Sequence, residues 1–411
     1  MLWFVGKVYS EFQDYLQSNG IPYGLFADAA QKHRKLRPAQ RTDIDFSDLG
    51  GLEAQLGAAR AADVDAVAVA GYENYVLPAA LIARYYGVPG PSPEAALAAT
   101  DKVTMRERFA ANCPELTPGF AEVGSWADIE QFMDSHGFPV MLKPANLMKS
   151  LLVTKNDSPP VLRRNFDGLA RETARLYEKY GVSQQPRFII EECVEGSMHT
   201  IAAFTEADGT PVIIPGVVDC TTAQDIGFDD NFLYSRSLPS LLDAQQAESL
   251  YAAASSGIKA LSLSSCPAHV ELILAAKGPK IIEIGARIGG YRTRLYEYGC
   301  GINLQKLAFD NAYGRSLAIT EPRHRSIAAI ELFPDGQGTF AGLHSRGTVE
   351  KLPSLRHLSV KPLPGRTIGR ASQGYKAAAV IILGNEDPEQ FQKDFDYVRE
   401  HATIDLAPPP G

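Results

Sequence analysis

The first hundred residues alternate short apolar runs with segments whose apolar residues recur at helical spacing. Strands that alternate with helices in this way are typical of βαβ units and a parallel sheet. We therefore predict an open parallel α/β sheet at the start of the chain. Its predicted elements, in order, are strand 2–5, helix 11–19, strand 23–26, helix 52–62, strand 66–70, helix 76–87 and a second helix that begins near Asp101.

From Pro118 onward the regular rhythm is lost, and the mixture of short strands and helices predicts α+β layers. The predicted strands lie at 138–143, 151–154, 188–192, 200–204 and 212–218, and the predicted helices at 126–136, 167–180, 243–261 and 304–312. After Pro322 short strands with many glycines and prolines follow. We expect an α/β domain at 1–100, a domain at 101–320 with lobes 101–190 and 191–320, and a C-terminal subdomain with a tail at 321–411.

Residues 268–290, AHVELILAAKGPKIIEIGARIGG, predict two apolar strands folded back on each other, each carrying one glutamate. A turn centred on Lys277 places Glu271 opposite Glu283. Directly opposed β-carbons on one face lie roughly 4.5–5.5 Å apart, where like charges repel. A divalent cation would remove this conflict. The alternative is an exposed hairpin with two solvated acids, because the strand pattern does not require both acids on one face.

The same pairing places His269 opposite Gly285, which predicts open space for a ligand beside the two carboxylates. Arg287 adds a cation close to this space.

Three further segments carry candidate residues. Asp101 is a plausible N-cap, and Lys102 beside it either reaches a site or is simply solvated. Lys143 ends an apolar strand, and because a buried lysine needs a partner, it either binds an anion such as phosphate or reaches the solvated rim. The strand 188–192 runs into a turn, Cys193–Gly196, that can offer backbone groups to a purine edge. The alternative is that residues 188–192 form an edge strand whose charges prevent pairing with other chains.

Taken in this order, these segments resemble the ATP-grasp superfamily, and specifically its carboxylate–amine ligase branch, the type of the L-amino acid ligases and dipeptide synthetases. The resemblance covers nearly the whole chain. It implies an ATP-grasp fold of mixed α/β and α+β class. Such a fold has an N-terminal open parallel α/β sheet, a two-lobed ATP-binding core and a small, mostly β, C-terminal subdomain.

The resemblance also implies roles for individual residues. Lys102 in YGVPGPSPEAALAATDK and Lys143 in GFPVMLKPA would contact ATP. The hinge IIEECVEG would hold adenine, with Glu191 or Glu192 near its exocyclic amine and backbone groups of Cys193 and Val194 beside it. Glu271 in HVEL and Glu283 in IIEIGARIGG would bind Mg²⁺, or Mn²⁺ in its place, with Arg287 facing the transferring phosphate. The segment DDNFLYSRSLPSLL resembles the loop that lies over the substrate.

Three departures from the family pattern are visible. Residues 145–150 read ANLMKS where many members have a glycine-rich phosphate loop, so side-chain donors of Lys149 and Ser150 are the expected substitutes. Gly285 stands where the family often has an asparagine as third metal ligand, and His269 could fill that space. Met198-His199 replaces the ribose-binding acid. For the substrate pocket we predict His269, Arg236, Gly289, Gly290, Tyr291 and Arg292.

The activity implied by the resemblance is an ATP-dependent, ADP-forming ligation. A carboxylate attacks the γ-phosphate of ATP to form an acyl phosphate, and an amine then displaces phosphate to leave an amide. The loops 145–155 and 224–240 are the expected lids that exclude water. The alternatives are a bicarbonate-activating enzyme, a ligase of the purine-biosynthesis type, and a nucleotide-binding protein without catalysis.

Composition narrows the partners. A net charge of −8 at pH 7 and the absence of Lys/Arg clusters argue against nucleic acid. No run approaches the roughly 20 apolar residues of a membrane helix, so we expect no membrane partner. The five cysteines (113, 193, 220, 266, 300) are scattered and form no CxxC pair, which fits a reducing cytoplasm. Small-molecule carboxylate and amine substrates are the expected partners. Because dimers are common in the superfamily, we also expect a homodimer.

Overall fold

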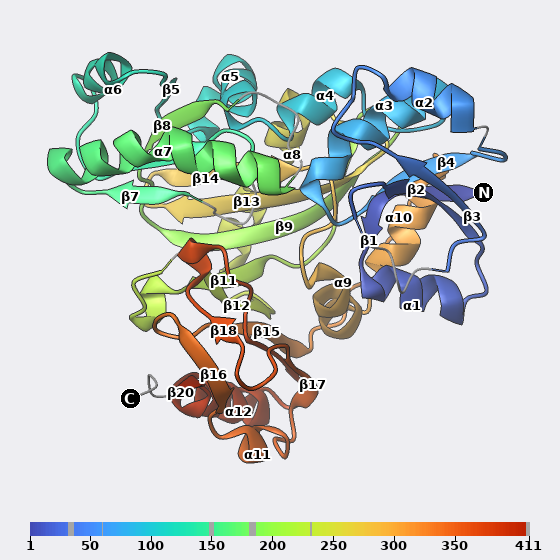
Figure 1. Cartoon of the computed structure of the whole chain (residues 1–411). Helices are drawn as coiled ribbons and strands as arrows, with labels where there is room; N and C mark the ends of the chain where they lie inside the picture. Colours follow the sequence, from blue (N-terminus) through green and yellow to red (C-terminus); the bar gives the residue numbers. More distant parts are fainter. Residues whose placement is uncertain (32–36, 60, 148–151, 181–185, 231, 408–411) are drawn as a thin grey trace.

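The computed structural model describes residues 1–31, 37–59, 61–147, 152–180, 186–230 and 232–407 (Figure 1). Its first sheet is parallel, with strand order β3-β2-β1-β4, and confirms the predicted N-terminal architecture. The elements of this region are β1 (Leu2–Val8), α1 (Ser10–Ser18), β2 (Tyr23–Asp28), β3 (Gln40–Ile44), α2 (Leu52–Ala59), β4 (Ala66–Ala70), the short 3-10 helix η1 (Glu73–Tyr75) and α3 (Val76–Tyr86). Sequence reasoning missed β3, because this edge strand is half exposed and carries few apolar residues.

The next elements form an antiparallel sheet with strand order β5-β8-β6-β7. The region comprises α4 (Pro93–Ala98), α5 (Lys102–Asn112), the short helix η2 (Pro114–Leu116), β5 (Phe120–Glu122), α6 (Trp126–Met133), β6 (Val140–Pro144), β7 (Thr154–Asn156), α7 (Pro159–Tyr180) and β8 (Phe188–Glu192). The strand β8 lies between β5 and β6. It is therefore not an edge strand, and that alternative for residues 188–192 is wrong.

A large antiparallel sheet follows, with strand order β14-β13-β9-β11-β12-β15-β19-β17 and β10 paired to β9. Its strands are β9 (Ser197–Thr205), β10 (Pro211–Ile213), β11 (Val218–Thr222), β12 (Leu233–Leu238), β13 (Pro267–Ala275), β14 (Gly278–Gly285), β15 (Ser326–Leu332), β17 (Leu355–Val360) and β19 (Ala379–Asn385). Strands from the C-terminal part of the chain thus extend the sheet that carries the glutamate hairpin. The predicted strand 212–218 is wrong, because the chain turns at Gly216, where φ is +115°, and forms β10 and β11 instead.

Helices cover this sheet and connect it to the rest of the molecule. The helix α8 (Ala244–Ala260) packs its apolar face on the back of β13 and β14, and α10 (Leu304–Ala312) packs on β4 and β9 (Figure 1). The remaining elements are η3 (Gln224–Ile226), α9 (Arg292–Leu295), the π-helical turn η4 (Tyr296–Cys300), α11 (Arg346–Val349), η5 (Ala371–Gln373), α12 (Pro388–His401) and a small sheet of β18 (Thr367–Ile368), β16 (Gly338–Leu343) and β20 (Ile404–Ala407).

The glutamate hairpin has the predicted register at its functional end. Glu271 pairs with Glu283, and His269 pairs with Gly285. The predicted turn centre is wrong, because Ala275 pairs with Gly278 and the turn consists of residues 276 and 277. A β-bulge between the two halves inserts one extra residue in β14 and restores the register of the glutamates. It also lets Ile281 pair with Leu272 and face the core, although Glu283 two residues later faces the opposite side.

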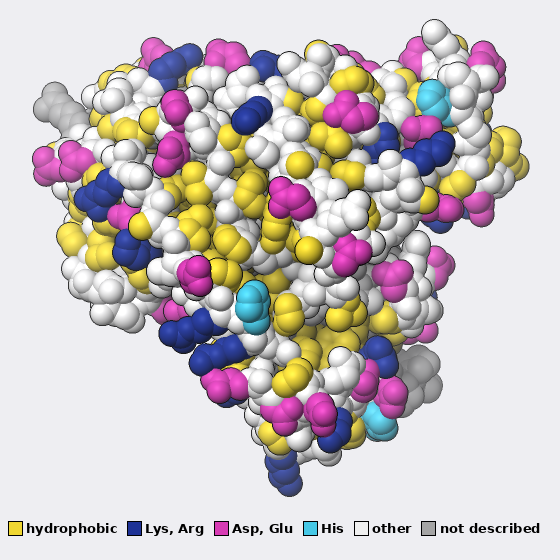
Figure 2. Space-filling model, turned by 180° about the vertical axis from the view of Figure 1, so that it is seen from behind, with side chains coloured by type: hydrophobic (Ala, Val, Ile, Leu, Met, Phe, Trp, Pro, Cys, Tyr) yellow, Lys and Arg dark blue, Asp and Glu magenta, His cyan; other side chains and the backbone are white. Residues whose placement is uncertain are grey.

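The surface shows no large field of one charge on the face seen in Figure 2, where Lys and Arg side chains alternate with Asp and Glu. Among the described residues, no helix combines the length and the apolar character that crossing a membrane requires.

Candidate active site

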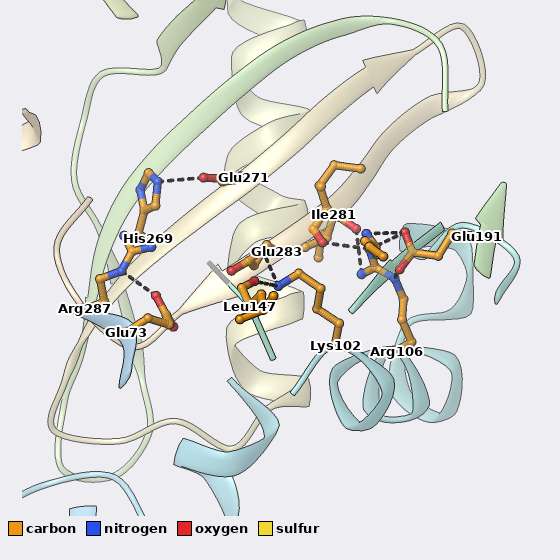
Figure 3. Close-up of polar contacts among 12 residues, drawn as sticks. Glu73, Lys102, Arg106, Leu147, Glu191, His269, Glu271, Ile281, Glu283 and Arg287 are labelled. Atoms are coloured by element: carbon orange, nitrogen blue, oxygen red, sulfur yellow. Dashed lines mark hydrogen bonds and ion pairs between the residues drawn. The ribbon is translucent and has the colours of Figure 1, made fainter. Parts of the chain in front are cut away.

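The candidate site lies where the β13–β14 hairpin meets the start of α5, the strand β8 and the segment after β4 (Figure 3). Glu271 and Glu283 face each other on one side of the hairpin, and each contacts a different partner. Oε2 of Glu283 lies 3.1 Å from Nζ of Lys102, and Oε1 of Glu271 lies 3.3 Å from Nε2 of His269. The two carboxylates are therefore close together as predicted, with Lys102 of α5 beside Glu283 and His269 of β13 beside Glu271.

His269 acts here as a neutral hydrogen-bond donor. Burial lowers the pKa of its ring to about 4, so the ring is uncharged at pH 7 and Nε2 carries the proton that it donates to Glu271. Burial alone would raise the pKa of Glu271, but the hydrogen bond from His269 and the Arg287 charge hold it at about 2. The carboxylate is thus ionised, as a metal ligand must be.

Lys102 is fixed by the helix that it begins. Asp101 caps α5 by accepting a hydrogen bond from the backbone N–H of Thr104 at 2.9 Å, which sets the direction of the first turn. Only 7% of Lys102 is exposed, and its ammonium donates to the carbonyl of Leu147 at 3.1 Å as well as contacting Glu283. The solvated alternative for Lys102 is therefore wrong.

Lys143 is also buried, which excludes the solvated alternative for it. Its Nζ lies 2.6 Å from Oε2 of Glu191 on the neighbouring strand, and burial lowers its pKa. Nε of Arg106 lies 2.9 Å from the other oxygen of the same carboxylate. Burial would raise the pKa of Glu191, but the Arg106 and Lys143 charges outweigh it and hold that pKa at about 2.

Arg106 was missed by sequence reasoning. It lies one helical turn after Lys102 on α5, so its position on the same helix face as a candidate ATP ligand was the available signal. Its guanidinium donates to the carbonyls of Ile281 at 3.1 Å and Ile282 at 2.7 Å, both at the bulge of β14. One fully buried guanidinium thus joins the carboxylate of Glu191 to the hairpin that carries the two facing glutamates.

The hinge residues differ in how they contribute. Glu192 is exposed, and its carboxylate accepts the backbone N–H of Gly119 at 2.6 Å, so Glu191 is the member of the pair that belongs to the buried cluster. The backbone N–H of Cys193 donates to the carbonyl of Pro139 at 3.3 Å, and Val194 is partly buried. Lys149 and Ser150 lie outside the described residues.

The predicted open space at Gly285 is wrong. The carboxylate of Glu73, from η1 after the first parallel sheet, occupies it: a β-carbon at position 285 would lie 2.9 Å from Oε2 of Glu73. Nε of Arg287 donates to the same oxygen at 2.6 Å. His269 does not fill this space, because its ring lies against Gly289. Glu73 was missed, and its only sequence signal was its position at the carboxyl end of a parallel strand.

Glu73 is poorly satisfied by the protein alone. It is nearly buried, and burial raises the pKa of its carboxyl, although the Arg287 charge opposes this. Its Oε1 is buried and has no hydrogen-bond partner among the described residues. An unsatisfied buried acceptor beside a carboxylate pair is a feature that a bound ligand with N–H donors would satisfy.

Of the remaining predicted substrate residues, Arg236 and Tyr291 share one partner, the carboxylate of Glu331. Arg236 forms an ion pair with Glu331 at 2.9 Å, and Tyr291 donates to the other oxygen of Glu331 at 2.8 Å. Arg292 is 2% exposed and donates to the hydroxyl of Thr200 at 2.6 Å and to the carbonyl of Gly290 at 3.0 Å. Within the described part of the chain, no carboxylate lies within ion-pair distance of Arg292, so its charge has no buried counter-ion.

Gly289, Gly290 and Tyr291 line a small pocket that reaches the first parallel sheet. The other residues that line it are Tyr9, Glu11, Phe12, Gly71, Ile288 and Thr293. Ile288, which directly follows Arg287 in the chain, is one of these lining residues. The structure therefore brings the predicted glycines and Tyr291 to the wall of one pocket.

A metal ion would find few ligands from the protein. No group of three or more His, Cys, Asp or Glu with metal-ligand geometry occurs among the residues that the structure describes. Mg²⁺ is commonly held by one or two carboxylates together with substrate phosphates. Two facing carboxylates next to Lys102 fit that donor set, and they do not fit a site made by the protein alone.

Comparisons with known proteins agree with the resemblance. Residues 136–294 match a family model described as ATP-grasp domain. The chain is 24% identical over 339 residues to an uncharacterized protein of Sinorhizobium fredii, covering 81% of this chain and 67% of that protein. It is 25% identical over 231 residues to alanine–anticapsin ligase of Bacillus subtilis, covering 53% of this chain and 48% of the ligase. The match thus spans about half the length of that ligase.

Two solved structures show the same fold over the full chain. An L-amino acid ligase from Bacillus licheniformis has a TM-score of 0.78 at 18% identity, and a phosphoribosylglycinamide synthetase from Anaerococcus prevotii has a TM-score of 0.69 at 16% identity. Each comparison covers 99% of both chains. This chain has the ATP-grasp fold and carries an ATP-grasp domain over residues 136–294.

The buried cluster at Glu191 gives a stability prediction. Replacing Glu191 with glutamine leaves Arg106 and Lys143 buried without a counter-ion, so we expect the free energy of unfolding to fall by about 3–5 kcal/mol. The neighbouring, exposed Glu192→Gln is the matched control and should change it by less than about 0.5 kcal/mol. Urea denaturation followed by circular dichroism measures both. Equal effects of the two substitutions would contradict the assigned cluster.

Proposed function

We propose that this protein is an ATP-dependent, ADP-forming ligase that joins the carboxylate of an amino acid or small metabolite acid to the amine of an amino acid. The observation that carries the proposal is the facing pair Glu271 and Glu283 beside the buried Lys102. A carboxylate pair beside a buried lysine is a donor set that would hold a nucleotide's phosphates and their metal.

The ATP end of the site would be built from residues on both lobes. Lys102 and Lys143 would contact phosphate oxygens, and the backbone of Cys193 and Val194 would border adenine. Glu271 and Glu283 would hold Mg²⁺, which when bound neutralises charge on the phosphate oxygens. Before the nucleotide enters, Lys102 contacts Glu283, and the hydrogen bond from His269 lowers the pKa of Glu271.

The substrate end would be built around two arginines. Arg287 is held by Glu73, so its side chain is fixed in direction at the edge of the carboxylate pair. Arg292 is a buried cation with no carboxylate at ion-pair distance among the described residues, and a buried charge is costly unless an anion meets it. We infer that Arg292 and Thr200 attract the carboxylate of the substrate to this side of the site.

The amino group of an amino-acid substrate has a matching acceptor. The unsatisfied Oε1 of Glu73 would accept an N–H from a substrate ammonium, a charge-assisted hydrogen bond. Tyr291, on the wall of the small pocket, would then lie beside the substrate side chain. A zwitterionic amino acid requires a carboxylate for its ammonium and a cation for its own carboxylate, and this site has both kinds of group. Bicarbonate has no ammonium and could not form an ion pair with Glu73.

The activity prediction is ADP release that depends on amino acids. With ATP and Mg²⁺, we expect the protein to release ADP and phosphate with a subset of a panel of amino-acid pairs, measured by coupled enzyme assay and by mass spectrometry of the amide. Glu271→Gln should lower turnover by roughly 100-fold or more, the scale expected for lost transition-state charge stabilisation. The exposed Glu248→Gln on α8 is the matched control and should leave turnover unchanged.

Other outcomes distinguish the competing functions. Release on bicarbonate alone would favour a bicarbonate-activating enzyme, and release only with a phosphoribosyl amine would favour the purine-biosynthesis type. ATP binding without release on any substrate would favour a non-catalytic relative. Any of these results contradicts the proposed amino-acid ligation.

Arg292 gives a second prediction on the substrate. Arg292→Met should raise KM for the carboxylate substrate by roughly 10- to 100-fold, because a charge-assisted hydrogen bond contributes about 1.5–3 kcal/mol, and should leave KM for ATP unchanged. Arg292→Lys should restore part of the loss because it keeps the charge. The exposed Arg163→Met on α7 serves as control. An equal rise in KM for both substrates would mean that Arg292 acts on the fold and not on the substrate.

A further inference from the structure

A second cavity lies behind the candidate site, between the first parallel sheet and α10. It encloses about 670 Å³ of empty space, counting the part that opens to solvent. Its walls come from β1, α1, β4, α3, the start of β13, the end of β14 and α10. The residues that line it include Phe12, Val76, Ala286, Gln305, Ala308 and Asn311. The cavity shares Phe12 with the small pocket beside Tyr291 and is otherwise separate from it.

The wall is apolar except for a few neutral groups, and two of these are unsatisfied. Oε1 of Gln305 and Oδ1 of Asn311 are buried and have no hydrogen-bond partner among the described residues. The amide of Asn311 is fixed in orientation, because its Nδ2 donates to the carbonyl of Thr205 at 2.8 Å. An acceptor buried without a partner destabilises a protein by about 1–3 kcal/mol, so two on one wall require a donor from elsewhere.

The chemistry of the wall defines the class of ligand. None of the residues that line the cavity carries a charge, so an ionised ligand would lose its hydration without compensation. An apolar body would replace water on the apolar wall, and an N–H or O–H group would satisfy the amide oxygens. We propose that this cavity is a binding site for a small, neutral, mostly apolar molecule with a hydrogen-bond donor, of the phenol or indole class.

The position of the cavity couples it to the candidate site. Ala286 lies between Gly285 and Arg287 in the chain, and Val76 directly follows the η1 turn that carries Glu73. A ligand in the cavity would therefore contact the backbone on both sides of the Glu73–Arg287 ion pair. It would stabilise the junction between the parallel sheet and the hairpin, and binding to the folded state raises the melting temperature.

The test uses phenol and benzene as a matched pair of probes, with benzoate as the charged control. Isothermal titration calorimetry on the full chain should show saturable binding of phenol, roughly tenfold weaker binding of benzene, and none of benzoate. Thermal melts should show stabilisation in the same order. No saturable binding of phenol or benzene would overturn the proposal and would mean that the cavity holds water only.

Variants locate the site. Ala308→Leu fills the cavity from α10 and should abolish binding of both probes, while Ala127→Leu, on an exposed position of α6, should not affect it. Gln305→Met keeps the volume and removes one acceptor, so it should weaken phenol toward the affinity of benzene and leave benzene unchanged. Circular dichroism confirms that each variant is folded. Phenol binding that survives Ala308→Leu in folded protein would overturn the assignment to this cavity. These measurements need no ATP and are independent of the proposed ligase activity.

Discussion

Two carboxylates that face each other across a hairpin repel each other when both are ionised, so they need cations close by, and this requirement organises the candidate site. Glu271 and Glu283 sit on β13 and β14, yet the groups that compensate them come from several elements. Lys102 begins α5, and Arg287 follows β14. Arg106, one turn after Lys102, binds the bulge that gives the two glutamates their register. Helix α5 thus supplies both the cation beside Glu283 and the guanidinium that holds the bulge of β14.

The same requirement explains the departure at Gly285. Without a side chain at this position, the carboxylate of Glu73 enters from the parallel sheet and pairs with Arg287. A larger residue would exclude it. The small residue in β14 therefore admits a carboxylate that the rest of the fold supplies.

The sequence pattern predicts the structure correctly where residues close together in the chain determine it. The alternation of residues along β13 and β14 predicted that Glu271 faces Glu283, and the helix-start pattern at Asp101 predicted the position of Lys102. The pattern does not predict the turn at residues 276 and 277. The turn lies slightly earlier than its predicted centre, and the β-bulge compensates for this shift, so the pairing of the two glutamates is the same in both cases. The helix α12 was also missed, although Asp387 and Pro388 form a typical helix start.

Contacts between distant segments could not be predicted. Glu73 and Arg287 are far apart in the chain, and only the docking of the parallel sheet on the hairpin brings them together. Arg106 likewise reaches Ile281 across the molecule. The two amide oxygens of α10 that have no partner among the described residues belong to residues that any amphipathic helix could carry, and what they could bind depends on the cavity around them. Such features follow from tertiary packing, which a single sequence does not encode in a readable pattern.

The measurement that tests the account most directly is the binding of ADP with and without Mg²⁺ by isothermal titration calorimetry, in the native protein and in Glu283→Gln. We predict that Mg²⁺ strengthens binding of ADP to the native protein at least tenfold, and that Glu283→Gln removes this gain while binding without Mg²⁺ persists. Absence of ADP binding, or a gain from Mg²⁺ that Glu283→Gln leaves intact, would contradict the assignment of the facing glutamates as the metal end of an ATP site.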